Sequence, residues 1–129
     1  DPQGIYLGGN QMAMSARSLL AFGDLYRNGG KAADGRQIVP ADWISQSWQQ
    51  RTNSRFSGDE YGYGWFTRQI GGEQVHFAWG YGGQMLYIVP SLDLTVVMTS
   101  EESGPSARNG YRDLLHDLLA DIIGAVRAA

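Results

Sequence analysis

HFAWGYGGQMLYIVP, residues 76–90, begins as a strand, passes through three glycines within four positions, and resumes as a strand that ends at a proline. Glycine has no Cβ atom, so such a run tolerates positive φ angles and lets another group approach the backbone closely. The run therefore suggests one wall of a pocket in which main-chain N–H groups face a ligand. A hairpin corner that only turns the chain is an alternative interpretation of the same residues, and it is the commoner structure for an isolated Gly-Tyr-Gly-Gly.

Strands are also predicted before this run. Residues 61–66 (YGYGWF) alternate large and small side chains with the period of a strand, and the small side chains suggest a close neighbour on one face. Gly71-Gly72 predicts a hairpin turn, after which residues 74–78 return as a strand. Residues 51–60 are polar and predict a loop.

After the glycines, residues 84–90 and 94–100 predict two further strands, joined by a turn over residues 90–93. Residues 94–98 (LTVVM) are almost continuously apolar, which predicts a strand inside the sheet with both faces covered. Successive strands joined by short turns predict an antiparallel meander.

Helices are predicted on both sides of the strands in the sequence. A serine cap before it and Asn-Gly-Gly after it predict a helix over residues 16–27. Pro40 suits the start of a second, short helix that carries Trp43 and Trp48. Tryptophans at helical spacing belong more often to a core than to a ligand site.

The last predicted helix runs from about Ser106 to Val126. Its apolar side chains form a nearly unbroken stripe that must be buried, and the preceding sheet is the obvious partner. The sequence therefore predicts an α+β fold, an antiparallel meander sheet covered by a long C-terminal helix, as a single domain over residues 1–129. The stripe consists of Tyr111, Leu114, Leu115, Leu118, Leu119, Ile122, Ile123 and Val126.

Composition excludes several classes of function. The net charge is −3 and the chain shows no basic footprint for nucleic acid. There is no cysteine, which excludes a thiol nucleophile and fits both the cytoplasm and the periplasm. No apolar run approaches the ~18 residues that span a bilayer. The start, residues 1–4, lacks the features of a signal peptide and reads like the middle of a longer protein.

A search for catalytic groups finds no complete active site. His76 and His116 have no G-x-S-x-G motif beside them, and no pair has metal-ligand spacing, so we expect neither a Ser-His-Asp triad nor a metal or other cofactor. His116 lies beside the apolar stripe and is expected to be structural or solvated. The acidic clusters are expected to be solvated charge; they are Asp59-Glu60, Glu101-Glu102 and Asp113/Asp117/Asp121.

Several local patterns together resemble one family, the serine hydrolases of the β-lactamase/penicillin-binding protein fold. The resemblance covers nearly the whole chain, and residues 78–84 are most similar to the branch that includes 6-aminohexanoate-dimer hydrolase and related esterases. The matching patterns, in order, are residues 14–23 (MSARSLLAFG), 25–30 (LYRNGG), 34–40 (DGRQIVP), 61–65 (YGYGW), 78–84 (AWGYGGQ) and the strands around Pro90.

The resemblance implies hydrolysis of a small-molecule amide or ester. Members of this family attack the carbonyl with the serine of an S-x-x-K motif, helped by its lysine and by a tyrosine of a Y-x-N-type motif, both of which precede the matched region. This sequence contains no S-x-x-K. The resemblance therefore implies a partial β-lactamase/transpeptidase-like fold, the C-terminal portion of a longer hydrolase, which is inactive without its N-terminal portion.

The resemblance also implies roles for the glycine-rich stretch. Residues 77–79 stand where β-lactamases carry Lys-Thr-Gly on a strand, and the absence of that lysine argues against β-lactamase activity itself. The strand can still supply a second N–H to a developing oxyanion. Gly80 is the first candidate for this donor, and Ala78 is the second because the alignment can slip.

The remaining residues of the stretch would form the substrate wall. Trp79 and Tyr81 would shape the acyl or leaving-group pocket, although both also suit simple packing. Gly82, Gly83 and Gln84 would complete the wall.

Two further expectations remain open. The isolated chain would expose a sheet edge through which copies could associate. A non-catalytic ligand-binding or interaction module on the same scaffold is the alternative function.

Overall fold

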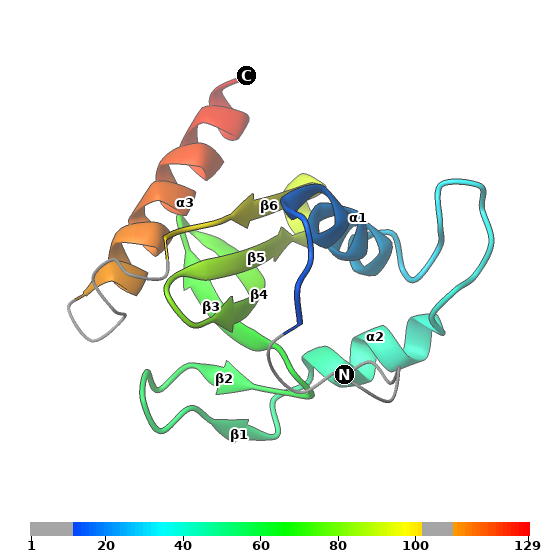
Figure 1. Ribbon diagram of the computed structural model, residues 1–129, viewed down its shortest axis with the longest axis horizontal. Helices are drawn as coiled ribbons and strands as arrows, with labels where there is room; N and C mark the ends of the chain where they lie inside the picture. Colours follow the sequence, from blue (N-terminus) through cyan, green and yellow to red (C-terminus); the bar gives the residue numbers. More distant parts are fainter. Residues whose placement is uncertain (1–11, 102–109) are drawn as a thin grey trace.

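The computed structural model describes residues 12–101 and 110–129 (Figure 1). Its six strands form one sheet in sequence order, each antiparallel to the next. The predicted α+β fold with an antiparallel meander and a C-terminal helix is therefore confirmed. The elements are α1 (Ala16–Arg27), α2 (Ala41–Trp48), β1 (Thr52–Asn53), β2 (Glu60–Tyr61), β3 (Phe66–Ile70), β4 (Glu73–Gly80), β5 (Gln84–Val89), a 3-10 turn η1 (Pro90–Leu92), β6 (Leu94–Met98) and α3 (Tyr111–Ala128).

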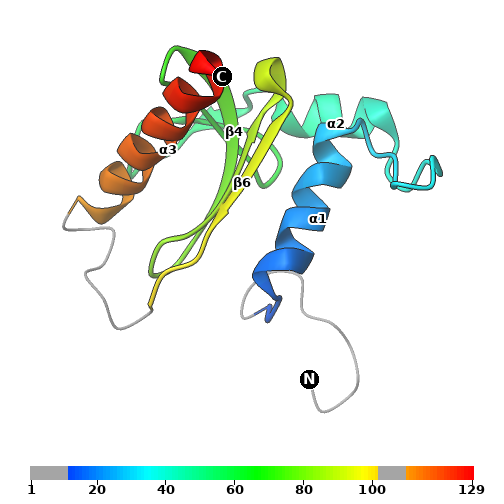
Figure 2. The same ribbon diagram turned by 90° about the horizontal axis from the view of Figure 1, so that it is seen from above.

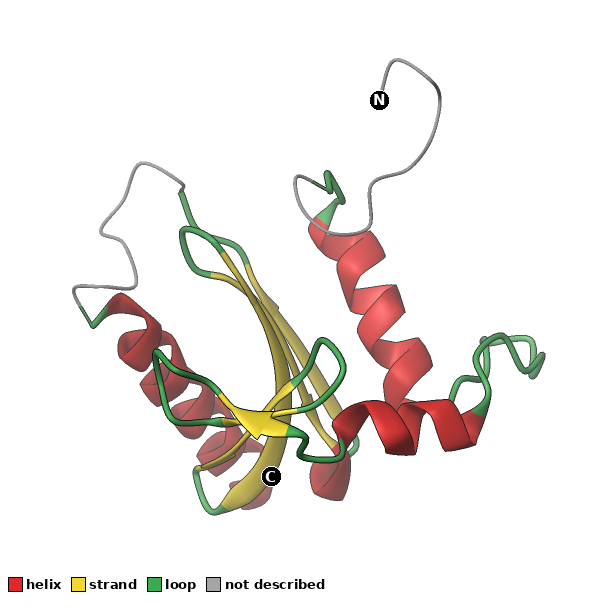
Figure 3. Cartoon of the chain, turned by 90° about the horizontal axis from the view of Figure 1, so that it is seen from below, coloured by secondary structure: helices red, strands yellow, loops and turns green. Residues whose placement is uncertain are grey.

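The sheet lies between two helices, with α3 on one face and α1 on the other (Figures 2 and 3). Side chains of a strand alternate between the faces, so β5 contributes to two cores. Met85, Tyr87 and Val89 pack with the buried side of α3, and Leu86 and Ile88 pack with Tyr26, Ile44 and Trp65 on the other face. None of residues 85–89 is more than 1% exposed.

Helix α1 begins and ends where the sequence predicts. The Ser15 hydroxyl accepts the N–H of Ser18 at 3.1 Å, and the N–H of Gly30 donates to the Leu25 carbonyl at 2.8 Å beyond the helix end. Gly29, the residue after the C-cap Asn28, has a φ of 65°, the left-handed conformation that ends a helix in this way. Arg27, in the last turn, donates to the Thr95 hydroxyl at 3.0 Å and pairs with Asp93, which fixes the helix against the sheet.

The chain between α2 and β3 differs from the prediction. The polar segment 51–60, expected to be a loop, contains β1 and the start of β2, whose residues are too few and too polar to show a strand pattern. Residues 61–66 are not one strand, because the chain leaves β2 after Tyr61 and turns before β3. Their small residues instead allow a close approach, since a Cβ on Gly62 would lie 2.1 Å from the Ser47 carbonyl oxygen.

One aromatic residue and one acidic residue also depart from expectation. Trp43 is not a core residue: it is 44% exposed and stacks on the ring of Tyr63, with centroids 5.7 Å apart. Asp59 is not solvated, because it is buried and its carboxylate lies 3.0 Å from Arg68 Nε. Asp113, in contrast, is exposed as predicted.

The last strand and helix are covered less than expected. Strand β6 lies at the edge of the sheet and not inside it, although Val97 packs towards α1 and Val96 towards α3. Association of copies through this edge stays a prediction.

Helix α3 starts at Tyr111, and the part of the predicted helix before Gly110 lies outside the described residues. Of the apolar stripe, Leu115, Leu119 and Ile123 are buried, whereas Leu114 is 64% exposed. The described sheet therefore covers only part of the apolar stripe of α3.

Both histidines belong to the interior. His116 Nδ1 lies 2.9 Å from the Tyr87 hydroxyl, and His76 Nδ1 lies 2.8 Å from the Thr67 hydroxyl. The His76 ring also stacks on Trp48, with centroids 4.2 Å apart. Burial lowers the pKa of each histidine from 6.5 to about 4, so both are neutral at pH 7.

We predict that substitution of Gly62 by alanine destabilises the fold, because its Cβ would collide with the backbone carbonyls of Ser47 and Gln49. The expected loss in unfolding free energy is about 2–4 kcal/mol, measured by urea denaturation. Gly124→Ala is the matched control, because nothing lies within 4 Å of that Cβ in the exposed part of α3. This control should gain roughly 0.5–1 kcal/mol. Equal effects of the two substitutions would contradict the close packing at Gly62.

We also predict that the protein loses stability as the pH falls from 6.5 towards 4. The two histidines take up protons at pH 6.5 in the unfolded chain but only near pH 4 in the native state, so their contribution is complete above pH 6.5 and is lost below it. Thermal unfolding of His76→Phe, which keeps a ring against Trp48, should depend less steeply on pH. Parallel curves for the two proteins would show that His76 does not titrate in this way.

Candidate functional site

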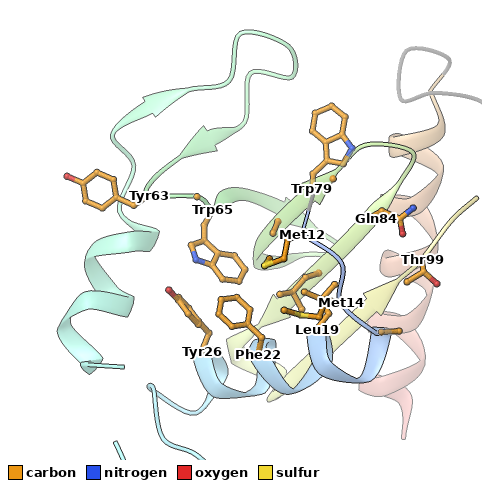
Figure 4. A pocket seen from close by; sticks show the side chains of 15 residues that line it. Met12, Met14, Leu19, Phe22, Tyr26, Tyr63, Trp65, Trp79, Gln84 and Thr99 are labelled. Carbon is orange, nitrogen blue, oxygen red and sulfur yellow. The ribbon is translucent and has the colours of Figure 1, made fainter. Parts of the chain in front are cut away.

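A cavity of about 590 Å³ lies between α1 and the turn end of the β4–β5 hairpin (Figure 4). Its lining contains no Asp, Glu, Lys or Arg side chain, so it is uncharged and mostly apolar. The lining residues are Met12, Met14, Ala16, Leu19, Phe22, Tyr26, Tyr63, Gly64, Trp65, Ala78, Trp79, Gly80, Gln84, Leu86 and Thr99.

Four of the seven residues predicted for the site line this cavity: Ala78, Trp79, Gly80 and Gln84. The other three do not. Tyr81 is 79% exposed and lies outside the lining, and Gly82 and Gly83 are buried behind the hairpin turn. Of the residues predicted for a wall, those that line the cavity thus flank the turn, residues 78–80 on β4 and Gln84 on β5.

The two adjacent glycines shape the turn itself. Gly82 and Gly83 have φ values of 77° and 90°, and the N–H of Gly83 donates to the Gly80 carbonyl at 3.3 Å. A Cβ on Gly83 would lie 2.6 Å from Tyr111 Cε1 on α3. Gly82 and Gly83 therefore form a hairpin corner. The close approach that Gly83 allows is to α3 and not to a group in the cavity.

Ser100 and Tyr111, which the sequence does not mark, hold this turn. The Gln84 amide donates to the Ser100 carbonyl at 2.6 Å and accepts the Ser100 N–H at 3.2 Å. The Ser100 hydroxyl donates to the Gly83 carbonyl at 3.0 Å and accepts the Tyr111 hydroxyl at 2.8 Å. The polar head of Gln84 is thus used in fixing the hairpin.

The cavity opens where β3 leaves β4. Pairing between these strands ends at Phe66 and Phe77, whereas pairing of β4 with β5 continues to Gly80. Residues 78–80 therefore have a strand neighbour on one side only. The chain that precedes β3, residues 63–65, lines the cavity on the opposite side of this gap.

The register decides which N–H groups face the gap. The two-residue turn Gly71-Gly72 has positive φ at both positions, so Ile70 and Glu73 form the hydrogen-bonded pair that closes the β3–β4 hairpin. Hydrogen bonding alternates along an antiparallel strand. The N–H groups of Ala78 and Gly80 thus point towards β5, and the N–H of Trp79 points towards the open edge.

The opposite end of the cavity is aromatic. Figure 4 shows the rings of Phe22, Tyr26 and Trp65 gathered there, with the ring of Tyr63 turned outwards. The Trp65 ring centroid lies 4.9 Å from that of Tyr26 and 6.4 Å from that of Phe22. From the sequence, α1 is predicted only as part of the core. The helical spacing of its apolar residues does not indicate that one side of the helix lines a cavity.

Other kinds of site find no support in the described residues. No group of three His, Cys, Asp or Glu side chains there is placed to hold a metal ion. None of the described helices is both long and apolar enough to cross a membrane.

Comparison with known protein families matches residues 1–121 to the family described as Beta-lactamase. The match covers most of the chain, including the cavity and the β4–β5 hairpin. Comparison with curated proteins finds no match.

Proposed function

The chain belongs to the β-lactamase family, and we propose that it is the C-terminal portion of a serine hydrolase that cleaves an amide or ester bond. In this proposal the chain supplies the wall of the substrate cavity, and the nucleophile lies elsewhere in the intact polypeptide. The absence of an S-x-x-K motif from residues 1–129 supports the second part. The open edge of β4 beside an apolar cavity is the observation that carries the first part.

A free main-chain N–H at a cavity wall can stabilise the negative charge that develops on a carbonyl oxygen during attack. The register favours Trp79 as the residue whose N–H does so, in place of Gly80 or Ala78, whose N–H groups point to β5. Gly80 and Ala78 then have a different role: the small methyl group of Ala78 and the lack of a side chain at Gly80 keep the wall accessible. A Cβ on Gly80 would lie only 3.2 Å from Gln84 Cβ, so a larger residue there would crowd β5.

The uncharged lining supports a neutral substrate with a bulky apolar group. Met12, Phe22 and Trp65 offer apolar surface, and no Lys or Arg side chain among the lining residues can pair with a substrate carboxylate. A charged group would lose its hydration there without a partner, which is costly. The similarity of residues 78–84 to 6-aminohexanoate-dimer hydrolase and related esterases supports the same choice of an amide or ester bond over a β-lactam.

We expect the isolated chain to be inactive and the intact polypeptide to hydrolyse neutral aryl esters. The measurement is release of p-nitrophenol from p-nitrophenyl acetate and phenylacetate, with an anionic β-lactam as the comparison. Turnover by the purified isolated chain would place the nucleophile within residues 1–129 and contradict the proposal. Binding of the esters by the intact polypeptide without turnover would favour the non-catalytic binding module.

Filling the wall should reduce activity in the intact polypeptide. Ala78 is half-buried at the cavity, so Ala78→Leu should lower kcat/KM for the neutral esters at least ~10-fold by displacing the carbonyl from the edge. Tyr81→Ala is the matched control from the same hairpin, because Tyr81 points away from the cavity. The control should stay within about threefold of the unsubstituted protein. A larger loss at Tyr81 than at Ala78 would move the wall to the turn.

A further inference from the structure

The first turn of α3 contacts the proposed wall from the face of the sheet opposite α1. We propose that Arg112 is a positioning residue, whose guanidinium holds the Trp79 side chain and thereby keeps the end of β4 oriented towards the cavity. The inference rests on the proposed function for its catalytic meaning, but the contact can be tested without any turnover.

Within residues 12–101 and 110–129, the closest contact of the Arg112 guanidinium with an aromatic ring is this one, and its charge also acts on the nearby Tyr87 and His116. Its Cζ lies 4.9 Å from the centroid of the Trp79 ring, and its side chain is only 13% exposed. Among the described residues its ion pair with Asp113 is long, 3.7 Å from Nη2 to Oδ1, and its Nε has no hydrogen-bond partner. A guanidinium withdrawn from water needs compensation, and a tryptophan face attracts a cation most strongly where water is excluded.

Trp79 needs such support because its backbone is held on one side only. Strand β3 ends its pairing at Phe77, so Trp79 depends on β5 for its main-chain neighbours. Strand ends that are paired on one side open readily. The Trp79 indole lies on the α3 face against Phe66, with centroids 6.2 Å apart, and Arg112 covers it there. Fixing this side chain on the α3 face restricts rotation of the Trp79 backbone, and so keeps its N–H in the plane of the sheet, directed towards the open edge.

Arg112 is itself fixed by the surroundings of the first turn. Asp113 Oδ1 lies 3.8 Å from Arg68 Nη1, and Arg68 Nε lies 3.0 Å from the buried Asp59 carboxylate, which ties α3 to the sheet. The preceding Tyr111 reaches Gly83 through Ser100. Two consecutive residues of α3 thus contact the β4–β5 hairpin at different places. Tyr111 holds its turn, and Arg112 holds the end of its first strand.

The test measures amide hydrogen exchange by NMR on the full chain. Arg112→Met keeps the length of the side chain and removes its charge. We expect exchange of the Gly80 amide, which points to β5 at the end of β4, to rise at least ~10-fold relative to that of Ile88, which pairs with His76 further along the strands, and the Trp79 indole N–H signal to shift. Arg112→Lys keeps the charge and should restore exchange to within about threefold. Arg127→Met is the control, because Arg127 anchors the other end of α3 through the Gly71 carbonyl and Glu73. It should lower overall stability without a selective rise in exchange at Gly80.

A second variant tests the contact between Arg112 and Trp79 if Arg112→Met does not fold. Trp79→Phe retains a ring with a weaker cation contact, and exchange of the Gly80 amide should then rise about threefold. Unchanged exchange of Gly80 in the variant that folds, or an equal rise at Gly80 and Ile88, would overturn the inference.

In the intact polypeptide, Arg112→Met should lower kcat at least ~10-fold and leave KM within about threefold. A selective rise in Gly80 exchange on Arg112→Met substitution, in a polypeptide that never hydrolyses esters, would refute the proposed function but support the positioning contact. Active protein with unchanged exchange in Arg112→Met would refute only the contact.

Discussion

Burial of β5 on both faces is the constraint on which the rest of the structure depends. Residues 85–89 are closed off from water by α3 on one side and by α1 with Trp65 on the other. Removing apolar surface from water stabilises the fold by roughly 25 cal/mol per Å². Because β5 buries apolar side chains on both faces, it fixes the positions of both helices. Each helix then reaches the hairpin that β5 shares with β4, α1 across the cavity and α3 behind the turn.

The candidate site follows from a difference between the two neighbours of β4. Its pairing with β5 continues to Gly80, but its pairing with β3 stops at Phe77 because the chain around Gly62 is drawn against the Ser47 carbonyl. The cavity is the space left by that divergence. Because its walls carry no charge, main-chain dipoles at the open edge act in a poorly polarisable surrounding, where they are stronger than in water.

Much of the fold could be predicted from the sequence, because helix caps, the Gly71-Gly72 turn and the apolar period are local signals. The errors have a common origin in contacts between distant residues. Burial of Asp59 depends on Arg68, exposure of Trp43 depends on Tyr63, and the edge position of β6 depends on which strands the sheet contains. At the candidate site, the glycine run marked the hairpin that borders the cavity, but only the register distinguishes the N–H of Trp79 from that of Gly80, and α1 gave no signal of its part in the cavity.

The order of the strands has a consequence for how the chain acquires its structure. Since β1 to β6 pair in the order of the sequence, each pairing closes a short loop and costs little chain entropy. Such local topologies fold quickly, and docking of α1 onto β6, which joins residues nearly seventy positions apart at Arg27 and Thr95, is the step with the largest closure cost. The hairpins are therefore expected to form early, with the cavity between α1 and the sheet completed last.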